Sequence, residues 1–430
     1  MASTFFGLTI AYSGLQAANT SLTITGHNVS NINTKGYTRQ QAGTQAADAL
    51  RTHTTYGAIG SGVVVTEISQ IRDSYYDVKY RNNMANYGQY SVKESYMGQI
   101  EDYLDEFTLN GYSQEYKNFF SAVNQLTITP GDTSAKNQLI NNAKSLADYF
   151  NTLTTNLRNV QADANNEIKD AVQQINSYAK NIAALNRQIN QIEANYGNAN
   201  DLRDKRNAMI DELSEIVNLE TSEEDMGNNV SNFSVRINGQ TLVSSYSYNT
   251  LETVARTDKK NYSDAEGLYD VQWNSGQKFD MYSTSLSGHL KGLIDIRDGN
   301  NGEHENIETD DDGNNVTDSD GNLVLTTAPA ADKTVSYKGV PYYQAQLNEF
   351  AKIFSDAVNK IMKSGYTSDG SSKGISLFVT QPNTTVMSAG NITVNPELLK
   401  NADLLAIKKE QNDGESDAKI MEELNKLQSE

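Results

Sequence analysis

Histidine and acidic side chains are the residue types in this chain whose spacing could support metal binding or catalysis. The sequence holds four histidines: His27, His53, His289 and His304. No two of them stand four residues apart on one helix face. A zinc protease uses the string H-E-x-x-H, and His304-Glu305 begins it, but position 308 is Glu. The histidines are therefore interpreted as solvated surface residues.

An acidic stretch gives the second test for a metal site. Asp310, Asp312 and Asn314 resemble the first ligands of an EF-hand calcium loop. The sixth position of that loop would be Asn315 and the twelfth Gly321, so the required Gly and Glu are both missing. The frame that begins eight residues later fails in the same way. A charged, solvated loop is the better interpretation.

Composition excludes several classes of function. The 430 residues carry 35 Lys and Arg against 54 Asp and Glu, for a formal charge of −19, and no cysteine. The missing cysteine excludes disulfide scaffolds, thiolate metal sites and a catalytic thiol. The negative charge argues against nucleic-acid binding, and no apolar stretch approaches a membrane span. No Walker A loop or G-x-S-x-G elbow occurs, so we expect no enzyme and no cofactor.

Residues 4–33 have the pattern of one amphipathic helix. Leucine and valine recur every seven residues, and aromatic and isoleucine side chains extend the same stripe. The stripe consists of Phe5, Leu8, Tyr12, Leu15, Leu22, Val29 and Ile32. The remaining surface of this helix is almost uncharged. A lone helix of this kind is marginal in water, so the stripe predicts an assembly interface that needs a partner helix.

A longer heptad pattern runs from Leu146 to Tyr196 and predicts a coiled-coil-like helix that is too long for a compact core. One 4-4 step at 160–168 is a stutter, which unwinds a coiled coil locally without ending it. Residues 34–61 are expected to form an irregular loop before a short strand at 63–71. Asn238-Gly239 lies between two alternating runs and predicts a β-hairpin. Further helices are predicted over 73–107, 113–127, 199–218, 286–298 and 342–364.

These patterns predict an α+β fold, elongated and multi-domain, with a long helical, coiled-coil-like bundle and a small β-rich inserted domain. We expect a terminal assembly helix at 1–33 and the first part of a helical rod domain at 34–219. The β-rich inserted domain is expected at 220–285, and return helices and loops at 286–430 would complete the rod domain. Residues 299–340 hold nine Asp or Glu against two Lys, which predicts a solvated acidic loop.

Several segments resemble a known family. Residues 14–18 (GLQAA) and 27–40 (HNVSNINTKGYTRQ) resemble the N-terminal signature of flagellar rod, hook and hook-associated proteins. The motif positions that we single out are Asn28, Asn31, Asn33, Gly36 and Tyr37. Residues 60–63 (GSGV), 72–77 (RDSYYD), 200–207 (NDLRDKRN) and 287–298 (SGHLKGLIDIRD) narrow the resemblance to the FlgK family of hook–filament junction proteins.

The resemblance implies an extracellular structural subunit of the bacterial flagellum, exported unfolded by the flagellar type III route without a cleaved signal peptide. Its implied partners are other copies of itself in a ring, the hook protein, the second junction protein and an export chaperone, with no nucleic acid and no membrane. Family chains continue past position 430 with C-terminal helices that pair with the N-terminal ones. This chain is therefore expected to be truncated, without those helices and without the chaperone site.

Two other classes of function stay open at this point. A surface adhesin or ligand-binding module would use the β-rich inserted domain and the acidic loop. An enzyme hidden in that domain is disfavoured because no nucleophile–base or metal spacing was found. Within the structural class, the second junction protein and the hook protein are alternatives, and the segments at 200–207 and 287–298 argue against both.

Overall fold

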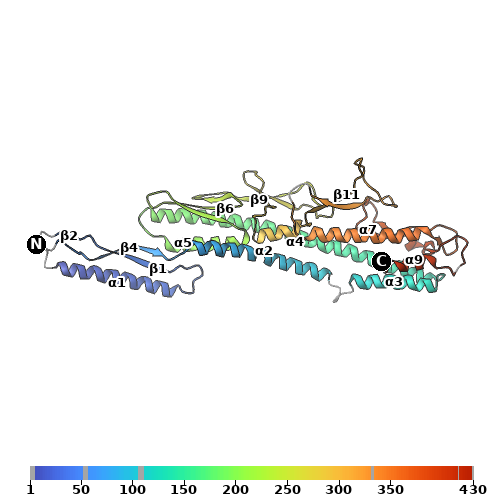
Figure 1. The fold of residues 1–430 in the computed structure, drawn as a ribbon, viewed down its shortest axis with the longest axis horizontal. Coiled ribbons are helices and arrows are strands. Elements are labelled where there is room, and N and C mark those ends of the chain that lie inside the picture. The colour runs from blue at the N-terminus through green and yellow to red at the C-terminus, as the bar shows by residue number, and fades with distance from the viewer. Residues whose placement is uncertain (1–4, 52–56, 105–110, 331–333, 415, 429–430) are drawn as a thin grey trace. The chain divides into compact units, whose positions relative to one another are not determined.

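The structure, a computed structural model, describes residues 5–51, 57–104, 111–330, 334–414 and 416–428 (Figure 1). The chain divides into two compact units, each built from three separate segments. Unit 1 comprises Met1–Tyr90, Asp170–Thr253 and Val271–Lys291, and unit 2 comprises Ser91–Lys169, Val254–Asp270 and Gly292–Glu430. The limits predicted at 33, 219 and 285 partition the chain differently and stay a prediction.

Helices and short antiparallel strand pairs alternate along the chain, which confirms the α+β class. The helices are α1 (Phe6–Ser30), α2 (Ser74–Leu104), α3 (Tyr112–Ile128), α4 (Thr133–Glu193), α5 (Asn200–Ile216), α6 (His289–Asp298), α7 (Val340–Ser364), α8 (Pro396–Lys400) and α9 (Lys419–Lys426). The strands are β1 (Gln40–Ala46), β2 (Leu50–Arg51), β3 (Ala58–Ile59), β4 (Val63–Gln70), β5 (Glu220–Asp225), β6 (Ser231–Ile237), β7 (Gln240–Ser244), β8 (Ser247–Tyr248), β9 (Leu251–Ala255), β10 (Tyr269–Trp273), β11 (Glu303–Ile307), β12 (Leu325–Pro329), β13 (Tyr366–Thr367), β14 (Phe378–Thr380), β15 (Ile392–Val394) and β16 (Ala406–Lys408).

The long heptad pattern is a single helix, α4, of 61 residues. It begins at Thr133, ahead of the heptad pattern, where the Asp132 carboxylate accepts a hydrogen bond from the N–H of Ser134 at 2.8 Å and caps the first turn. Its heptad side chains Leu157, Ile168 and Ile175 are buried, as the pattern predicts.

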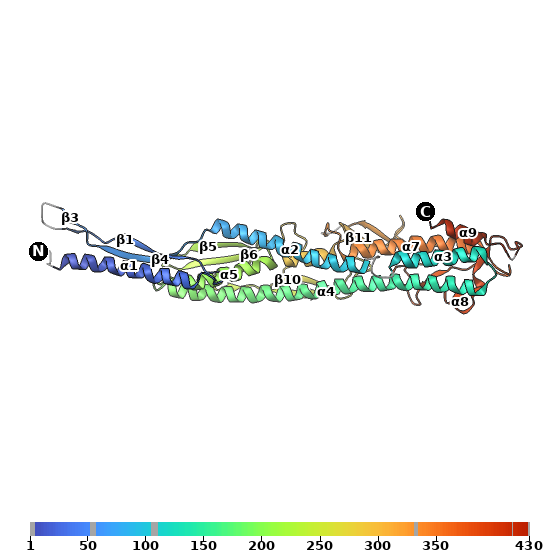
Figure 2. The ribbon, with the colours of Figure 1, turned by 90° about the horizontal axis from the view of Figure 1, so that it is seen from below.

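In unit 1, α1 lies along the antiparallel pair of β1 and β4 (Figures 1 and 2). A four-stranded antiparallel sheet with the order β5-β6-β7-β8 belongs to the same unit. The predicted hairpin is confirmed, because Asn238 and Gly239 connect β6 to β7. Ala85 and Gly88 on α2 face inward, and a Cβ on Gly88 would lie 2.2 Å from the carbonyl oxygen of Glu215.

In unit 2, the apolar core is formed by α3, α7, α9 and the first part of α4. Phe119, Phe354 and Phe378 contact one another there, with ring centroids 5.6 to 6.2 Å apart. Helix α9 lies against both α3 and α7 in the two ribbon views (Figures 1 and 2). The aromatic cluster packs together segments that lie far apart in sequence and forms part of the apolar core of this unit.

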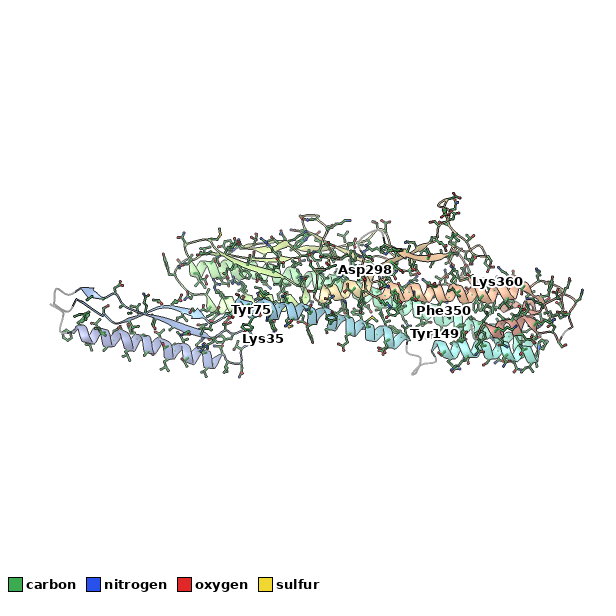
Figure 3. All side chains as sticks on the ribbon, viewed as in Figure 1. Lys35, Tyr75, Tyr149, Asp298, Phe350 and Lys360 are labelled. Carbon is green, nitrogen blue, oxygen red and sulfur yellow. The ribbon has the colours of Figure 1, made fainter. Side chains whose placement is uncertain are left out.

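A buried ionic cluster adds to unit 2. The Asp298 carboxylate accepts hydrogen bonds from both nitrogens of the Arg256 fork, at 2.8 and 3.0 Å, and from Arg297 at 2.6 and 2.9 Å (Figure 3 labels Asp298). Burial raises the pKa of Asp298, but the two guanidinium groups outweigh it and hold that pKa well below its usual range.

Two predicted loops contain strands instead. Within 34–61, expected to be irregular, β1 pairs with β4 from Gln40 opposite Gln70 to Ala46 opposite Val63. The polar sequence of β1 has little strand propensity, and its partner strand supplies the pairing that local pattern does not show.

The acidic stretch 299–340 is likewise more than a solvated loop, so that prediction was wrong for residues 303–307 and 325–329. Strand β11 pairs with β12, and Glu305 within β11 is only 2 % exposed. Its carboxylate accepts a hydrogen bond from the Asn348 side chain at 2.8 Å, which ties the hairpin to α7. Two tight turns project between the strands, and in each an aspartate, Asp310 or Asp318, accepts N–H groups two and four residues on. The prediction was based on the number of charged residues, which does not show that some positions of this hairpin are buried.

Candidate assembly interface

The apolar stripe predicted on the first helix lies on the surface of α1. Its seven members are strongly exposed: Phe5 69 %, Leu8 67 %, Tyr12 59 %, Leu15 67 %, Leu22 71 %, Val29 64 % and Ile32 77 %. Phe5 stands at the position before the helix, and Ile32 lies just beyond its end. Single exposed apolar side chains are ordinary, but here seven of them follow one side of a helix, interrupted by Asn19 and Gly26. We call these seven residues the leucine stripe.

The opposite side of α1 is held by its own unit. Ala17 and Ile24 are buried, and the helix contacts β1 and β4. The Ser13 hydroxyl accepts a hydrogen bond from the N–H of Val63, at the start of β4, at 3.2 Å. Because this inner side is occupied, the leucine stripe cannot turn inward without breaking these contacts.

The family-motif residues lie in the turn that joins α1 to β1. The Asn28 side chain accepts hydrogen bonds from the Tyr37 hydroxyl at 2.7 Å and from the N–H of Gln40 at 2.9 Å. It also donates to the Gln40 carbonyl at 2.9 Å. His27 Nδ1 lies 3.0 Å from the same Tyr37 oxygen. We call these contacts among Asn28, Tyr37 and Gln40 the turn lock.

The other motif residues shape the same turn. Asn31 donates from its side chain to the carbonyl of His27 at 3.0 Å, and Thr34 donates to the Asn31 side chain at 3.2 Å. Asn33 is exposed. Gly36 has φ +80, and a Cβ there would lie 2.9 Å from the Cβ of Ala208 on α5. Glycine is required here for both backbone conformation and close packing.

Ionic contacts then fix the turn to α5. The N–H of Thr38 donates to the buried carboxylate of Asp204 at 3.0 Å. Lys35 pairs with Glu212 at 3.0 Å, and its hydrogen bond to that carboxylate raises the pKa of Lys35 (Figure 3 labels Lys35). Burial raises the pKa of the Tyr37 hydroxyl, and Asp201 and Asp204 raise it further.

A second group of charges ties the start of α2 to α5. Arg72 donates to Asp77 at 2.6 Å and lies 3.7 Å from Asp211, and the buried Arg81 donates to Asp211 at 2.7 Å. The segments at 72–77 and 200–207 were singled out from the sequence only as family resemblance. The contacts of Arg72 and Arg81 with Asp211, which lies beyond the second segment, were missed, because nothing local pairs an arginine with an aspartate 130 residues away.

Neither a metal-binding cluster nor a helix fit to span a membrane is found among the described residues. Among the described residues, no group of three His, Cys, Asp or Glu side chains is placed to hold a metal ion. His53 lies outside the described residues. No helix in the described ranges has the length and hydropathy to cross a membrane. What the site offers is an apolar stripe at a fixed orientation.

Comparison with known proteins finds a matching family and several similar proteins. Residues 97–378 match the helical domain of the flagellar hook-associated protein FlgK family. Flagellar hook-associated protein 1 of Bacillus subtilis is 27 % identical over 390 residues, which cover 87 % of this chain and 70 % of the relative. The same protein of Salmonella typhimurium is 33 % identical over 219 residues, covering 50 % of this chain and 39 % of that protein.

One solved structure shares the fold. The flagellar hook junction protein FlgK from Burkholderia pseudomallei superposes with a TM-score of 0.52 at 23 % identity. The match covers 70 % of this chain and 46 % of that chain. The chain thus spans less than half the length of the Salmonella and Burkholderia relatives.

Proposed function

Because this chain belongs to the family of the flagellar hook-associated protein FlgK, we propose that it is a structural subunit of the bacterial flagellum that joins hook to filament. The observation that carries the proposal is the leucine stripe, exposed along α1 while the other side of the helix is held by β1 and β4. The chain acts by assembly and not by catalysis.

The leucine stripe supplies the driving force for assembly. Full burial of one large apolar side chain stabilises a complex by about 1.5–3 kcal/mol, so several together can outweigh the ordering costs of association. The occupant proposed for the stripe is a helix of the assembly, of the kind that the family resemblance implies for the C-terminal ends of its members. The turn lock sets the direction of α1 before that helix arrives.

Partners and location follow from the same proposal. The chain would form a ring with other copies of itself and would contact the hook protein and the second junction protein. It would reach the outside of the cell by the flagellar export route, without a cleaved signal peptide and with the help of an export chaperone. The relatives named flagellar hook-associated protein 1 support the flagellar location.

Substitution on two sides of α1 tests the proposal. We expect Leu15→Lys with Leu22→Lys, placed in the chromosomal gene, to abolish filament attachment and swimming, because a charged stripe cannot be buried. The matched control is Thr9→Lys with Gln16→Lys, which adds the same charges to the exposed polar side of α1. Swarming and electron microscopy of hooks give the measurement. Normal filaments in the stripe variant, with the protein present, would contradict the proposal.

A further inference from the structure

A second aromatic surface lies on α2, within unit 1. Tyr76, Tyr80, Tyr87 and Tyr90 follow heptad-like spacing and are 67 %, 50 %, 62 % and 67 % exposed. The exposed Asn83 fills the gap in the middle of the row. Tyrosine is enriched in protein interfaces because it offers a large, rigid contact area. We call these four exposed side chains the tyrosine face.

Helix α1 carries a complementary surface beside its leucine stripe. Small side chains repeat there with 4-3 spacing and are all exposed: Gly7, Ala11, Gly14, Ala18 and Ser21. Each precedes a position of the leucine-stripe heptad, so this small-residue face lies about 100° around the helix from the stripe. A Cβ added at Gly7 or Gly14 would meet no atom within 4 Å.

We propose that the tyrosine face of one copy packs against the small-residue face of α1 on a second copy. This inference rests on the proposed function, because it names a contact between subunits of the same assembly. It leaves the leucine stripe of α1 available for a helix from elsewhere in the assembly.

Shape and charge both favour this occupant. Large side chains on one helix interdigitate best with small ones on its partner, and both rows share the same 4-3 period. No Asp, Glu, Lys or Arg occurs from Phe6 to Gly26, so burial of the small-residue face desolvates no charge. The exposed area of the four tyrosines and an equal area of α1 would together cover on the order of 1,000 Å², near the lower limit for a specific contact.

The contact is heterologous, since each copy uses two different surfaces. Every copy can therefore give its small-residue face to one neighbour and receive another on its tyrosine face. Such contacts propagate and close into rings or continue as helices. That geometry suits a subunit of a ring or an axial structure.

Disulfide mapping tests the inference, and the cysteine-free sequence gives a clean background. One sample of the full chain carries Asn83→Cys, which keeps all four tyrosines. A second, with a different tag, carries one cysteine on α1: Ala11→Cys, Gly14→Cys, Ala18→Cys or Ser21→Cys. After mixing and mild oxidation, we expect the covalent mixed dimer to reach at least about ten times the control level at one of the four positions, because disulfides need Cα atoms within about 7 Å.

The control pairs Asn83→Cys with Gln16→Cys, which lies on the polar side of the same helix. Four results at control level would overturn the inference. So would homodimers from Asn83→Cys alone or from the α1 variants alone, since these indicate α2–α2 or α1–α1 pairing. Circular dichroism confirms that each variant is folded. Failure here with loss of filaments in the leucine-stripe variant would reject this contact and leave the proposed function standing.

Discussion

At the scale of single residues, Asp298 is a buried carboxylate in unit 2 that is paired with two arginines. Its side chain is 3 % exposed and is held by Arg256 and Arg297. We expect Asp298→Asn to lower the free energy of unfolding by about 3–5 kcal/mol at pH 7, because two guanidinium groups would lose their buried counter-charge. Urea unfolding measures the change. The control is Asp311→Asn on an exposed turn, where we expect almost none.

The stabilisation that Asp298 gives to the folded state depends on pH. The pKa of Asp298 is lowered in the folded state, so its stabilisation is present above the ordinary aspartate pKa of about 4 and is lost as pH falls toward the folded-state value. The difference in unfolding free energy between wild type and Asp298→Asn should therefore be constant near pH 7 and shrink below about pH 4. A difference that grows in acid would contradict the assignment.

Residue roles could be predicted from the sequence only where they follow from local pattern. The leucine stripe follows from period alone, and its exposure needed only the inference that it lacks a partner. The turn lock did not follow from period, because Asn28 and Tyr37 meet through a turn whose geometry depends on Gly36 and on Ala208 of α5. Contacts between distant charged residues, such as Arg81 with Asp211, leave no local signal.

At the scale of elements, the turn between α1 and β1, with its turn lock, orients α1. We expect Asn28→Ala to loosen it, since the hydroxyl of Tyr37 and the N–H and carbonyl of Gln40 would each lose a partner. The cost is about 1–3 kcal/mol and local to this joint. Hydrogen exchange should show faster exchange in α1 and β1 with α5 unchanged.

Asn33→Ala is the matched control for the joint, because it removes the same side chain from an exposed position of the same turn. It should leave exchange rates at the wild-type level. Equal effects from the two substitutions would show that the turn depends on asparagine content and not on the turn lock.

Elements with a strong period or a clear turn signal were predictable, including the β6–β7 hairpin, whereas β1 and the β11–β12 hairpin were not. α5 and α7 lie where apolar spacing placed them, and α4 covers most of its heptad pattern and extends ahead of it to Thr133. Strand β1 carries only small and polar residues, so its structure comes from β4 and not from its own sequence. The β11–β12 hairpin was hidden because the buried Glu305 looks like surface when only charge is counted.

At the scale of the whole molecule, a net charge of −19 opposes contact between copies. The small-residue face of α1 contributes no charge of its own, so salt should screen the general repulsion without weakening the contact. We expect self-association of the purified chain to strengthen several-fold between about 0.02 M and about 0.3 M NaCl. Sedimentation velocity at matched concentration measures it, with Tyr87→Ala plus Tyr90→Ala as the control. Weaker association at high salt would point to ion pairs at the contact.

The turn lock lies at one end of α1, so a change of angle there moves the other end of the helix. Helix α1 has 25 residues, which corresponds to a reach of about 37 Å at the usual rise per residue. A tilt of roughly 10° at Asn28 would displace the far tip by about 6 Å, more than one helical turn. Side chains near Phe6 would move most and those near Asn28 least. The three hydrogen bonds of the turn lock, together with the contacts of α1 to β1 and β4, therefore set where the far half of the leucine stripe meets its partner.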